Sequence, residues 1–259
     1  MLDILNEEYC FTASDKVFYY GYSFIEGSFK EYIANKVKPK LIDEEWTQEL
    51  VNAAVELTGF SADNFAGIFE NKSSYSCWRI GEAVAECVLE DSGKARFYYN
   101  ACRDLKNPRA NNTGADLVGF CDRDGQTMFL FGEVKTSSSP ETPPSVMYGK
   151  SGMIEQLKEL LTDESKRNNL IKWITGKINL LPEAFKKDYK NAINTYFILK
   201  KVQLVGVLVR DTDPNELDLK NRAKDLEEYA SSDKKVWLFA LYTQLSMDNW
   251  NTAMNGGAT

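Results

Sequence analysis

Two carboxylates and one amine near the middle of the chain have the spacing that metal-assisted chemistry requires. Asp116 lies in the apolar segment 115–121, and Glu133 lies in the apolar segment 127–135, where Lys135 follows it two residues later. Alternate residues of a strand point to the same face of a sheet, so Glu133 and Lys135 share a face if 127–135 is a strand. The three side chains are therefore candidates for one site.

The turn between the two segments determines how they pair. Asp124-Gly125 separates them, and Asp-Gly between two apolar runs is typical of a two-residue hairpin turn. With these residues as the turn, Asp116 lies directly opposite Glu133, and their Cβ atoms are about 4.5–5.5 Å apart. Lys135 then points to the face that holds both carboxylates.

Two facing carboxylates on an apolar sheet repel each other and lose hydration, so they need a compensating cation. Mg²⁺ characteristically takes one or two carboxylates together with phosphate and water oxygens. We therefore expect Mg²⁺, with Mn²⁺ as a substitute, between Asp116 and Glu133, where it would activate a water for attack on a phosphodiester. Lys135 would stabilise the negative charge that develops. The alternative is a plain surface pair of Glu133 and Lys135 opposite an aspartate at a strand end.

The composition excludes several other kinds of catalytic site. The 259 residues include no histidine, which excludes a Ser-His-Asp triad, a Cys-His pair and a His-ligated zinc site. The five cysteines are odd in number and form no Cys-X-X-Cys pair, which disfavours a disulfide framework and a zinc ribbon. Carboxylates, lysine, tyrosine, serine or a bound metal must therefore perform any chemistry.

The overall composition is typical of a soluble globular protein. Hydrophobic residues make up 43% of the sequence. No apolar run approaches the roughly 20 residues of a membrane helix, and the first residues are acidic rather than basic as in a signal peptide. We therefore expect a cytoplasmic protein. The pattern changes near Ser76, so we predict an N-terminal appendage at 1–75, a core at 76–245 and a C-terminal tail at 246–259.

Apolar periodicity predicts the order of the elements. In the first segment, 9–24 is typical of a hairpin and 43–58 of a helix with Asp43 as its N-cap. The elements expected after residue 75 are a helix at 76–90, strands at 95–101, 115–121 and 127–135, a loop at 136–149, helices at 151–161 and 164–190, a strand at 202–210, a helix at 214–231 and a strand at 235–242. This order predicts an α/β fold around a mixed sheet.

The two motifs also resemble a known family of enzymes. Gly114-Ala-Asp-Leu-Val-Gly-Phe and Gly132-Glu-Val-Lys-Thr-Ser are similar to the motifs of the PD-(D/E)XK, or restriction-endonuclease-like, superfamily of nucleases. That superfamily has a core of helix, three strands, helix and strand, which is the order expected here. The resemblance makes Asp116, Glu133 and Lys135 the motif residues and implies a metal-dependent nuclease.

Other residues match the superfamily less specifically. Ala115 stands where the superfamily name has proline, and this departure leaves the metal ligands unchanged. Members often have another metal-binding glutamate on the first core helix, for which Glu82 is the best match and Glu86, one turn later, the second. Either glutamate is otherwise a solvated helix charge. Gln156 matches a glutamine that many members have on the helix after the lysine strand.

A narrower resemblance covers residues 76–245. The two motifs, the proline-rich loop and the closing strand–helix–strand are similar to the HamA family, the nuclease subunits of the Hachiman anti-phage system. That resemblance implies DNA as the nucleic acid that is cleaved. It also implies a helicase subunit, HamB, as the partner.

The charge distribution bears on nucleic-acid binding. The net charge of −7 argues against strong binding by the chain alone, because phosphate neutralisation needs Lys and Arg. Segment 160–210, with ten basic and four acidic residues, is either a solvated face or a surface that follows a duplex. Its candidate contacts are Lys166, Arg167, Lys172, Lys177, Lys186, Lys187 and Lys190. Arg103, Lys106 and Arg109 are further candidates, although a solvated loop fits them equally.

Two other functions remain open on the sequence. One is a nuclease fold that binds or regulates without activity of its own, which the intact Asp116, Glu133 and Lys135 disfavour. The other is a different metal-dependent reaction, such as hydrolysis of phosphate monoesters. Chelator-sensitive cleavage of DNA, compared with cleavage of a simple monoester, distinguishes the three.

Overall fold

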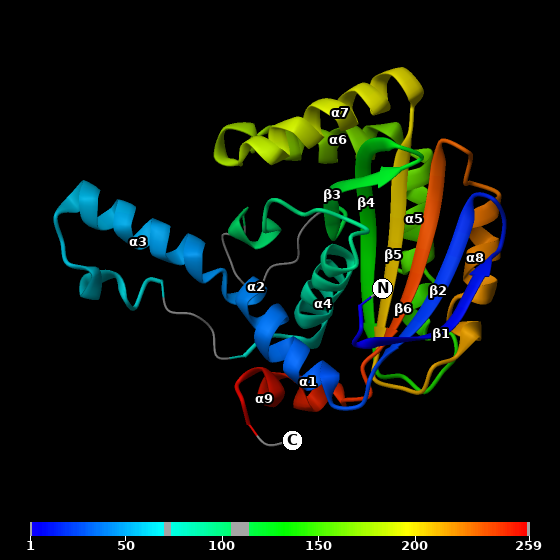
Figure 1. Cartoon of the computed structure of the whole chain (residues 1–259), viewed down its shortest axis with the longest axis horizontal. Helices are drawn as coiled ribbons and strands as arrows, with labels where there is room; N and C mark the ends of the chain where they lie inside the picture. Colours follow the sequence, from blue (N-terminus) through cyan, green and yellow to red (C-terminus); the bar gives the residue numbers. More distant parts are fainter. Residues whose placement is uncertain (1, 70–73, 105–113, 258–259) are drawn as a thin grey trace.

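The computed structural model of the chain describes residues 2–69, 74–104 and 114–257. At its centre is one mixed sheet of six strands in the order β1-β2-β6-β5-β4-β3 (Figure 1). The four inner strands are parallel, and β1 and β3 pair antiparallel at the two edges. The strands are β1 Leu5–Thr12, β2 Val17–Phe24, β3 Leu117–Arg123, β4 Gln126–Ser137, β5 Val202–Arg210 and β6 Lys234–Tyr242. The predicted α/β class with a mixed sheet is confirmed.

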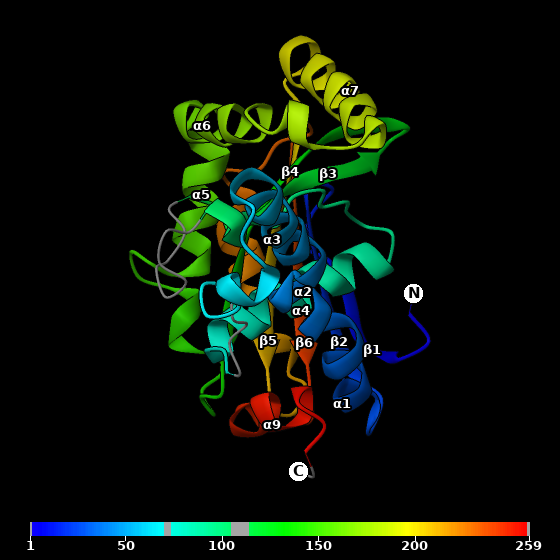
Figure 2. The same cartoon turned by 90° about the vertical axis from the view of Figure 1, so that its left-hand side faces the viewer.

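Helices cover both faces of this sheet (Figure 2). α4, α1 and α9 bury their apolar side chains on one face, and α5, α6, α7 and α8 bury theirs on the other. The helices are α1 Ser28–Tyr32, α2 Lys38–Ile42, α3 Glu44–Thr58, α4 Cys77–Asp91, α5 Met153–Thr162, α6 Glu164–Thr175, α7 Glu183–Leu199, α8 Lys220–Glu227 and α9 Trp250–Met254. Short helical turns are η1 Ile33–Val37, η2 Ala62–Phe65, η3 Ala101–Asp104, η4 Ser145–Met147, η5 Ile178–Leu180, η6 Glu216–Asp218 and η7 Met247–Asn249.

Two local features position the site. All nine residues of β5 are buried, which agrees with its nearly continuous apolar sequence and with a parallel strand covered on both faces. α4 can lie close to β4 because Gly81 has no side chain: a Cβ there would be 2.1 Å from Thr136 Oγ1. The helix that contains Glu82 is thereby held against the strand that contains Glu133.

The predicted N-terminal appendage at 1–75 is wrong for much of its length. The hairpin expected at 9–24 exists as β1 and β2, but β2 pairs in parallel with β6 and so belongs to the central sheet. α1 packs Phe29 against Trp250 of α9, with ring centroids 5.6 Å apart. Such contacts join segments far apart in sequence, so local patterns could not reveal them.

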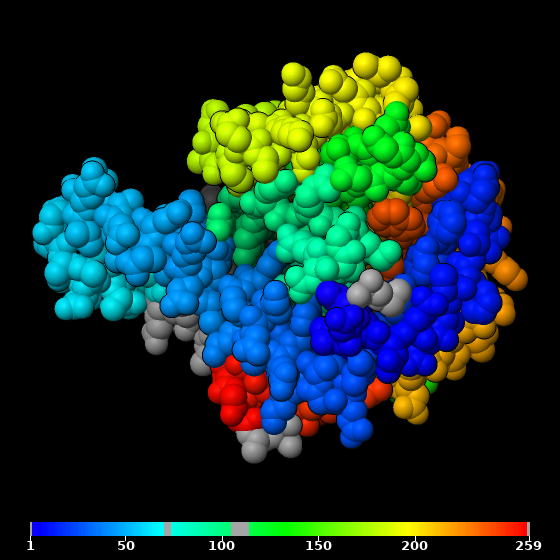
Figure 3. Space-filling model, in the orientation of Figure 1, coloured from blue at the N-terminus to red at the C-terminus, as the bar shows by residue number. Residues whose placement is uncertain are grey.

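α3 is the part of this segment that does project from the body (Figure 3). It buries no side chain, and it confirms the helix expected at 43–58. Asp43 does not cap it through its side chain, because that residue is left-handed with φ of 50°. Its carboxylate instead accepts hydrogen bonds from Arg103 Nε and Nη2 at 2.6 and 2.7 Å.

The predicted C-terminal tail at 246–259 is also corrected by tertiary packing. Its described part contains α9, in which Trp250 is fully buried in the core. The helix expected at 214–231 is shorter than predicted, because Asn215 starts a separate turn, η6, by accepting a hydrogen bond from the Leu217 N–H at 3.0 Å. α8 then begins at Lys220.

The strand expected at 95–101 does not form. The segment makes one bridge to β3, between Arg96 and Phe120. It passes over the strand at Gly119, where a Cβ would be 2.6 Å from the Arg96 carbonyl oxygen. The segment therefore touches β3 at one point instead of pairing along its edge.

Candidate active site

The hairpin that contains the predicted site forms as the sequence indicates. Asp124 and Gly125 make the turn, with φ of 54° and 72°. Positive φ at both positions is what a type I′ turn requires. The register continues to Leu117 opposite Gly132, so the next positions on the two chains are Asp116 and Glu133, as predicted.

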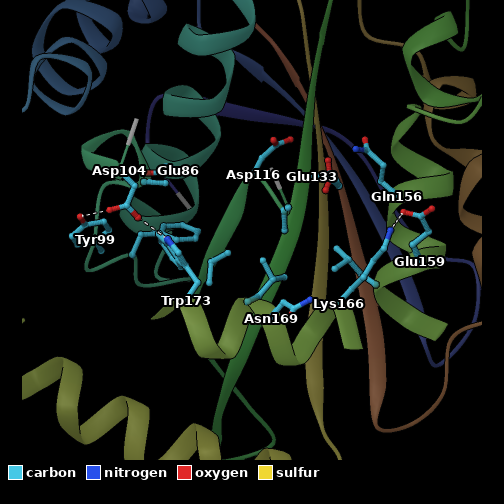
Figure 4. A pocket seen from close by; sticks show the side chains of 17 residues that line it. Glu86, Tyr99, Asp104, Asp116, Glu133, Gln156, Glu159, Lys166, Asn169 and Trp173 are labelled. Carbon is cyan, nitrogen blue, oxygen red and sulfur yellow. Dashed lines mark hydrogen bonds and ion pairs between the residues drawn. The ribbon is translucent and has the colours of Figure 1, made fainter. Parts of the chain in front are cut away.

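Asp116 lies just before β3. Its side chain accepts the hydrogen bond that a backbone carbonyl would accept if the pairing of β3 and β4 continued. Its Oδ2 accepts a hydrogen bond from the Val134 backbone N–H at 2.8 Å. This hydrogen bond fixes the Asp116 carboxylate beside Glu133 of β4. Figure 4 shows both carboxylates at the same cavity.

Glu133 is buried, with 3% of its surface exposed. Burial raises its pKa, the charge of Asp116 raises it further, and Lys135 offsets part of the effect, so that the pKa of Glu133 is about 8. The Lys135 Nζ is 3.5 Å from Glu133 Oε2. Burial beside Asp116 therefore favours the neutral form of Glu133 over its ionised form. The pair is short of positive charge.

α4 brings two glutamates toward this pair. Glu82 accepts a hydrogen bond from Arg79 Nη1 at 2.6 Å. Burial and, next, the charge of Asp116 raise the pKa of Glu82 to about 7. Glu86 lines the same cavity as Asp116, but Lys40 Nζ is 2.8 Å from its carboxylate. Each glutamate therefore has a cation of its own, and the charge of Asp116 also acts on Glu82.

The carboxylate pair opens into a cavity of about 700 Å³ that is bounded by the sheet, α4, α5, α6 and η3. Gln156 extends into it from α5, as Figure 4 shows. The Gln156 Oε1 atom is buried and has no hydrogen-bond partner among the described residues. A buried amide oxygen without a donor or cation is costly. This oxygen is therefore able to accept a hydrogen bond or to face a cation at the cavity.

The residues at the cavity fit a magnesium ion. Within the described ranges, no three or more side chains of the usual metal-binding types converge as a complete metal site. Mg²⁺ does not need such a set, because it keeps several waters and is commonly held by one or two carboxylates and by substrate phosphates. Asp116 and Glu133 supply the carboxylates, and Gln156 offers a neutral oxygen. Glu82, bound to Arg79, is not brought in as a third ligand.

No family model and no curated protein matches the chain. None of the helices in the described part of the chain is both long enough and apolar enough to cross a membrane.

Arg167, one of the basic residues expected to contact nucleic acid, has a structural role instead. It is buried, and its Nη1 donates hydrogen bonds to the carbonyl oxygens of Leu160 and Leu161 at 2.6 and 3.0 Å. These carbonyls belong to the last turn of α5, whose carbonyl groups lack partners within the helix. Arg167 therefore holds α6 against the end of α5.

The other predicted basic residues lie on or near α6 and α7. Three have acidic partners, which are Glu159 for Lys166, Asp104 for Lys177 and Glu183 for Lys186. The three remaining lysines of the predicted set are exposed, and these are Lys172, Lys187 and Lys190. Of the predicted set, Lys166 lines the cavity. Arg103 is held by Asp43, as described above, and Lys106 and Arg109 lie outside the described residues.

The aromatic side of the cavity was not predicted from the sequence. Phe97 and Tyr99 line it from the segment before η3, and Trp173 lines it from α6. A signal was present on α6, where Lys166, Asn169 and Trp173 recur at helical spacing and therefore share one face. Placing that face beside the carboxylates required the tertiary structure.

Proposed function

We propose that this protein is a metal-dependent nuclease that hydrolyses phosphodiester bonds of nucleic acid. The observation that supports it most is the buried pair of Asp116 and Glu133, which is short of positive charge and opens into a large cavity. Holding two carboxylates in this state costs folding stability. A divalent ion together with a substrate phosphate would compensate that cost.

Each residue of the pair has a defined role in this proposal. Asp116 and Glu133 would hold the ion, and the Gln156 oxygen would face it. When bound, Mg²⁺ polarises the phosphate and lowers the pKa of a water molecule. Lys135 favours the ionised form of Glu133 and adds positive charge close to the reacting phosphate. The Val134 N–H keeps Asp116 in place before substrate arrives.

The motif resemblance supports a more specific assignment to the PD-(D/E)XK superfamily. α4, β3, β4 and α5 follow the helix, strand and helix order of a restriction-endonuclease-like core, and a single bridge stands in place of the first expected strand. The likeness to the HamA family favours DNA as substrate and a cytoplasmic anti-phage role with a helicase partner. The net charge of −7 agrees with a need for a partner that delivers the nucleic acid.

Incubation of the full chain with negatively supercoiled plasmid, which opens short unpaired stretches, tests the proposal. We expect cleavage in Mg²⁺, loss of cleavage in EDTA, and recovery when Mg²⁺ or Mn²⁺ is added back. Lys135→Ala should remove cleavage while the protein stays folded. Lys150→Ala, at an exposed position outside the cavity lining, is the matched control and should cleave normally. Cleavage that persists in EDTA would contradict the proposal.

Small chromogenic substrates separate nuclease chemistry from monoester hydrolysis. A nuclease should release nitrophenol from bis(p-nitrophenyl) phosphate, a diester, faster than from p-nitrophenyl phosphate, a monoester. The opposite preference, without plasmid cleavage, would assign the same carboxylates to a phosphatase. Absence of both activities, with Mg²⁺ bound, would favour a binding module.

A further inference from the structure

One side of the cavity is built from aromatic rings rather than charges. Phe97, Tyr99 and Trp173 line it, and each is partly buried. The rings of Tyr99 and Trp173 meet edge to face, with centroids 5.7 Å apart and an interplanar angle of 76°. In Figure 4 these two rings lie on the side of the cavity away from Gln156, with the carboxylate pair between.

Asp104 fixes the polar ends of this aromatic wall. Its carboxylate accepts hydrogen bonds from Trp173 Nε1 at 2.6 Å and from the Tyr99 hydroxyl at 2.9 Å. Lys177 Nζ donates to the same carboxylate at 2.7 Å. The indole N–H and the phenol O–H are therefore already satisfied. Lys177 Nζ also lies over the two rings, 4.4 Å from the Tyr99 centroid and 5.4 Å from the Trp173 centroid. The ring surface that lines the cavity is what the two residues offer to a ligand.

The same face of α6 adds polar groups beside the wall. Lys166, Asn169 and Trp173 follow one another at intervals of three and four residues, and all three line the cavity. An amide that offers both donors and acceptors and an amine thus lie on the helix that provides the indole. The face of a single ring, with an amide next to it, matches the chemistry of a nucleobase, which can stack on the ring and form hydrogen bonds with the amide.

We propose that the wall of Phe97, Tyr99 and Trp173 is the subsite for an unpaired nucleobase, and that the substrate is single-stranded nucleic acid. The inference rests on the proposed function, because the base belongs to the strand whose phosphate meets Asp116 and Glu133. Bases inside a duplex are stacked on each other, so a base can stack on a protein ring only after it leaves that stack. A wall inside a cavity therefore selects an unpaired strand.

The charge of the cavity supports the same substrate class. Among the described residues, its lining includes Asp104, Glu159 and three other acidic residues, but a single lysine, Lys166, which is itself paired with Glu159. A duplex needs several phosphate contacts from Lys and Arg, and the described lining does not supply them. Stacking is insensitive to sequence, because every base has an aromatic face, and it adds binding energy that does not come from phosphate neutralisation.

Binding of a short fluorescent single strand by the full chain tests this subsite, with Ca²⁺ in place of Mg²⁺ and at low salt. Trp173→Ala should weaken binding about 5- to 150-fold, which is the range for loss of one base–aromatic stack. Trp173→Phe keeps an aromatic ring but loses the bond to Asp104, and it should retain most of the affinity. Phe197→Ala removes an exposed ring of α7 outside the cavity, and binding should not change.

Abasic oligonucleotides provide the decisive comparison. The set consists of strands that each carry one abasic position, placed differently in each strand. One of these strands should bind the wild type more weakly than the intact strand does. The same strand should bind Trp173→Ala about as well as the intact strand does. Equal losses for Trp173→Phe and Trp173→Ala, or tighter binding of a matched hairpin duplex than of the single strand, would overturn the subsite.

Cleavage separates the failure of this inference from the failure of the proposed function. Plasmid or duplex cleavage that does not depend on Trp173 would reject the subsite and leave the nuclease intact. Base-dependent binding without cleavage in Mg²⁺ would retain the subsite and reject the nuclease.

Discussion

Two buried carboxylates of this chain have opposite surroundings. Asp218 in η6 is fully buried, and it accepts hydrogen bonds from Arg210 Nη1 at 2.5 Å and from the Tyr242 hydroxyl at 2.9 Å. Glu133 is almost as buried, at 3% exposure, but its neighbours are another carboxylate and a lysine 3.5 Å away. One carboxylate is fully compensated by the protein, and the other is not.

This difference separates a structural ion pair from the proposed metal site. Arg210 also donates a hydrogen bond to the Glu141 carbonyl oxygen at 3.1 Å, so its pair with Asp218 ties the loop after β4 to β5. A buried charge that only maintains the fold is given its partners by the chain. The shortage of positive charge at Glu133 is explained if its partner arrives from solvent as a metal ion.

The largest expected effect is the loss of plasmid cleavage when Glu133 is replaced. Glu133→Gln should lower plasmid cleavage by about a hundredfold to a thousandfold, because it removes the negative charge that would hold the ion. The thermal midpoint should not fall, since burial beside Asp116 already favours the neutral form of the wild-type side chain. Glu155→Gln, an exposed change on α5, should cleave normally in the same assay. A folded Glu133→Gln protein with wild-type cleavage would refute the site.

The reverse pattern is expected at the compensated carboxylate. Asp218→Ala leaves the buried Arg210 guanidinium without its partner, which should cost about 3–5 kcal/mol of unfolding free energy. Denaturant titration measures this loss, and the exposed Asp213→Ala serves as its control. Cleavage per folded molecule should be retained. A similar loss of cleavage at Asp218 and at Glu133 would abolish the distinction between them.

Metal-free protein should lose stability as the pH rises from about 5 to about 8. The pKa of Glu133 rises from 4.5 to about 8 on folding, so in this range the folded state holds a proton that the unfolded state has lost. The stability that comes from the proton on Glu133 is fully present below pH 4.5 and is lost as the pH rises through 8. At about 1.4 kcal/mol for each pKa unit, its full size is on the order of 5 kcal/mol.

Unfolding measured across this pH range, with and without Mg²⁺, tests whether the stability falls as the pH rises. Mg²⁺ should restore stability at high pH, since it favours the ionised carboxylate. Glu133→Gln should flatten the profile. Wild-type stability that instead increases from pH 5 to pH 8 would show that Glu133 is compensated in some other way.

The smallest effect is expected at the turn that sets the register. Gly125 has φ of 72°, which alanine resists, so Gly125→Ala should cost about 1 kcal/mol. The ladder should keep its register, and cleavage should persist. Inserting one residue at the turn should reduce cleavage much more than stability if the slip propagates, because one carboxylate would then point to the opposite face. Unchanged cleavage in a protein shown to have slipped would contradict the need for facing carboxylates.

The sequence by itself determined the hairpin and the carboxylate pair. Asp124-Gly125 defines the turn chemistry, and strand alternation then places Asp116 beside Glu133, because both rules act over a few neighbouring residues. The buried strand β5 was predicted with its observed bounds, since a continuous apolar run shorter than a typical helix leaves few alternatives.

Only the tertiary structure decided how distant segments meet. β2 lies beside β6 and Trp250 is buried because each has partners far along the chain. Arg167 caps α5 because of packing that periodicity does not encode. The aromatic wall is of the same kind, because Tyr99 and Trp173 become neighbours through Asp104. Local patterns report which face of an element is apolar, whereas the element that covers this face is selected by the packing of the whole chain.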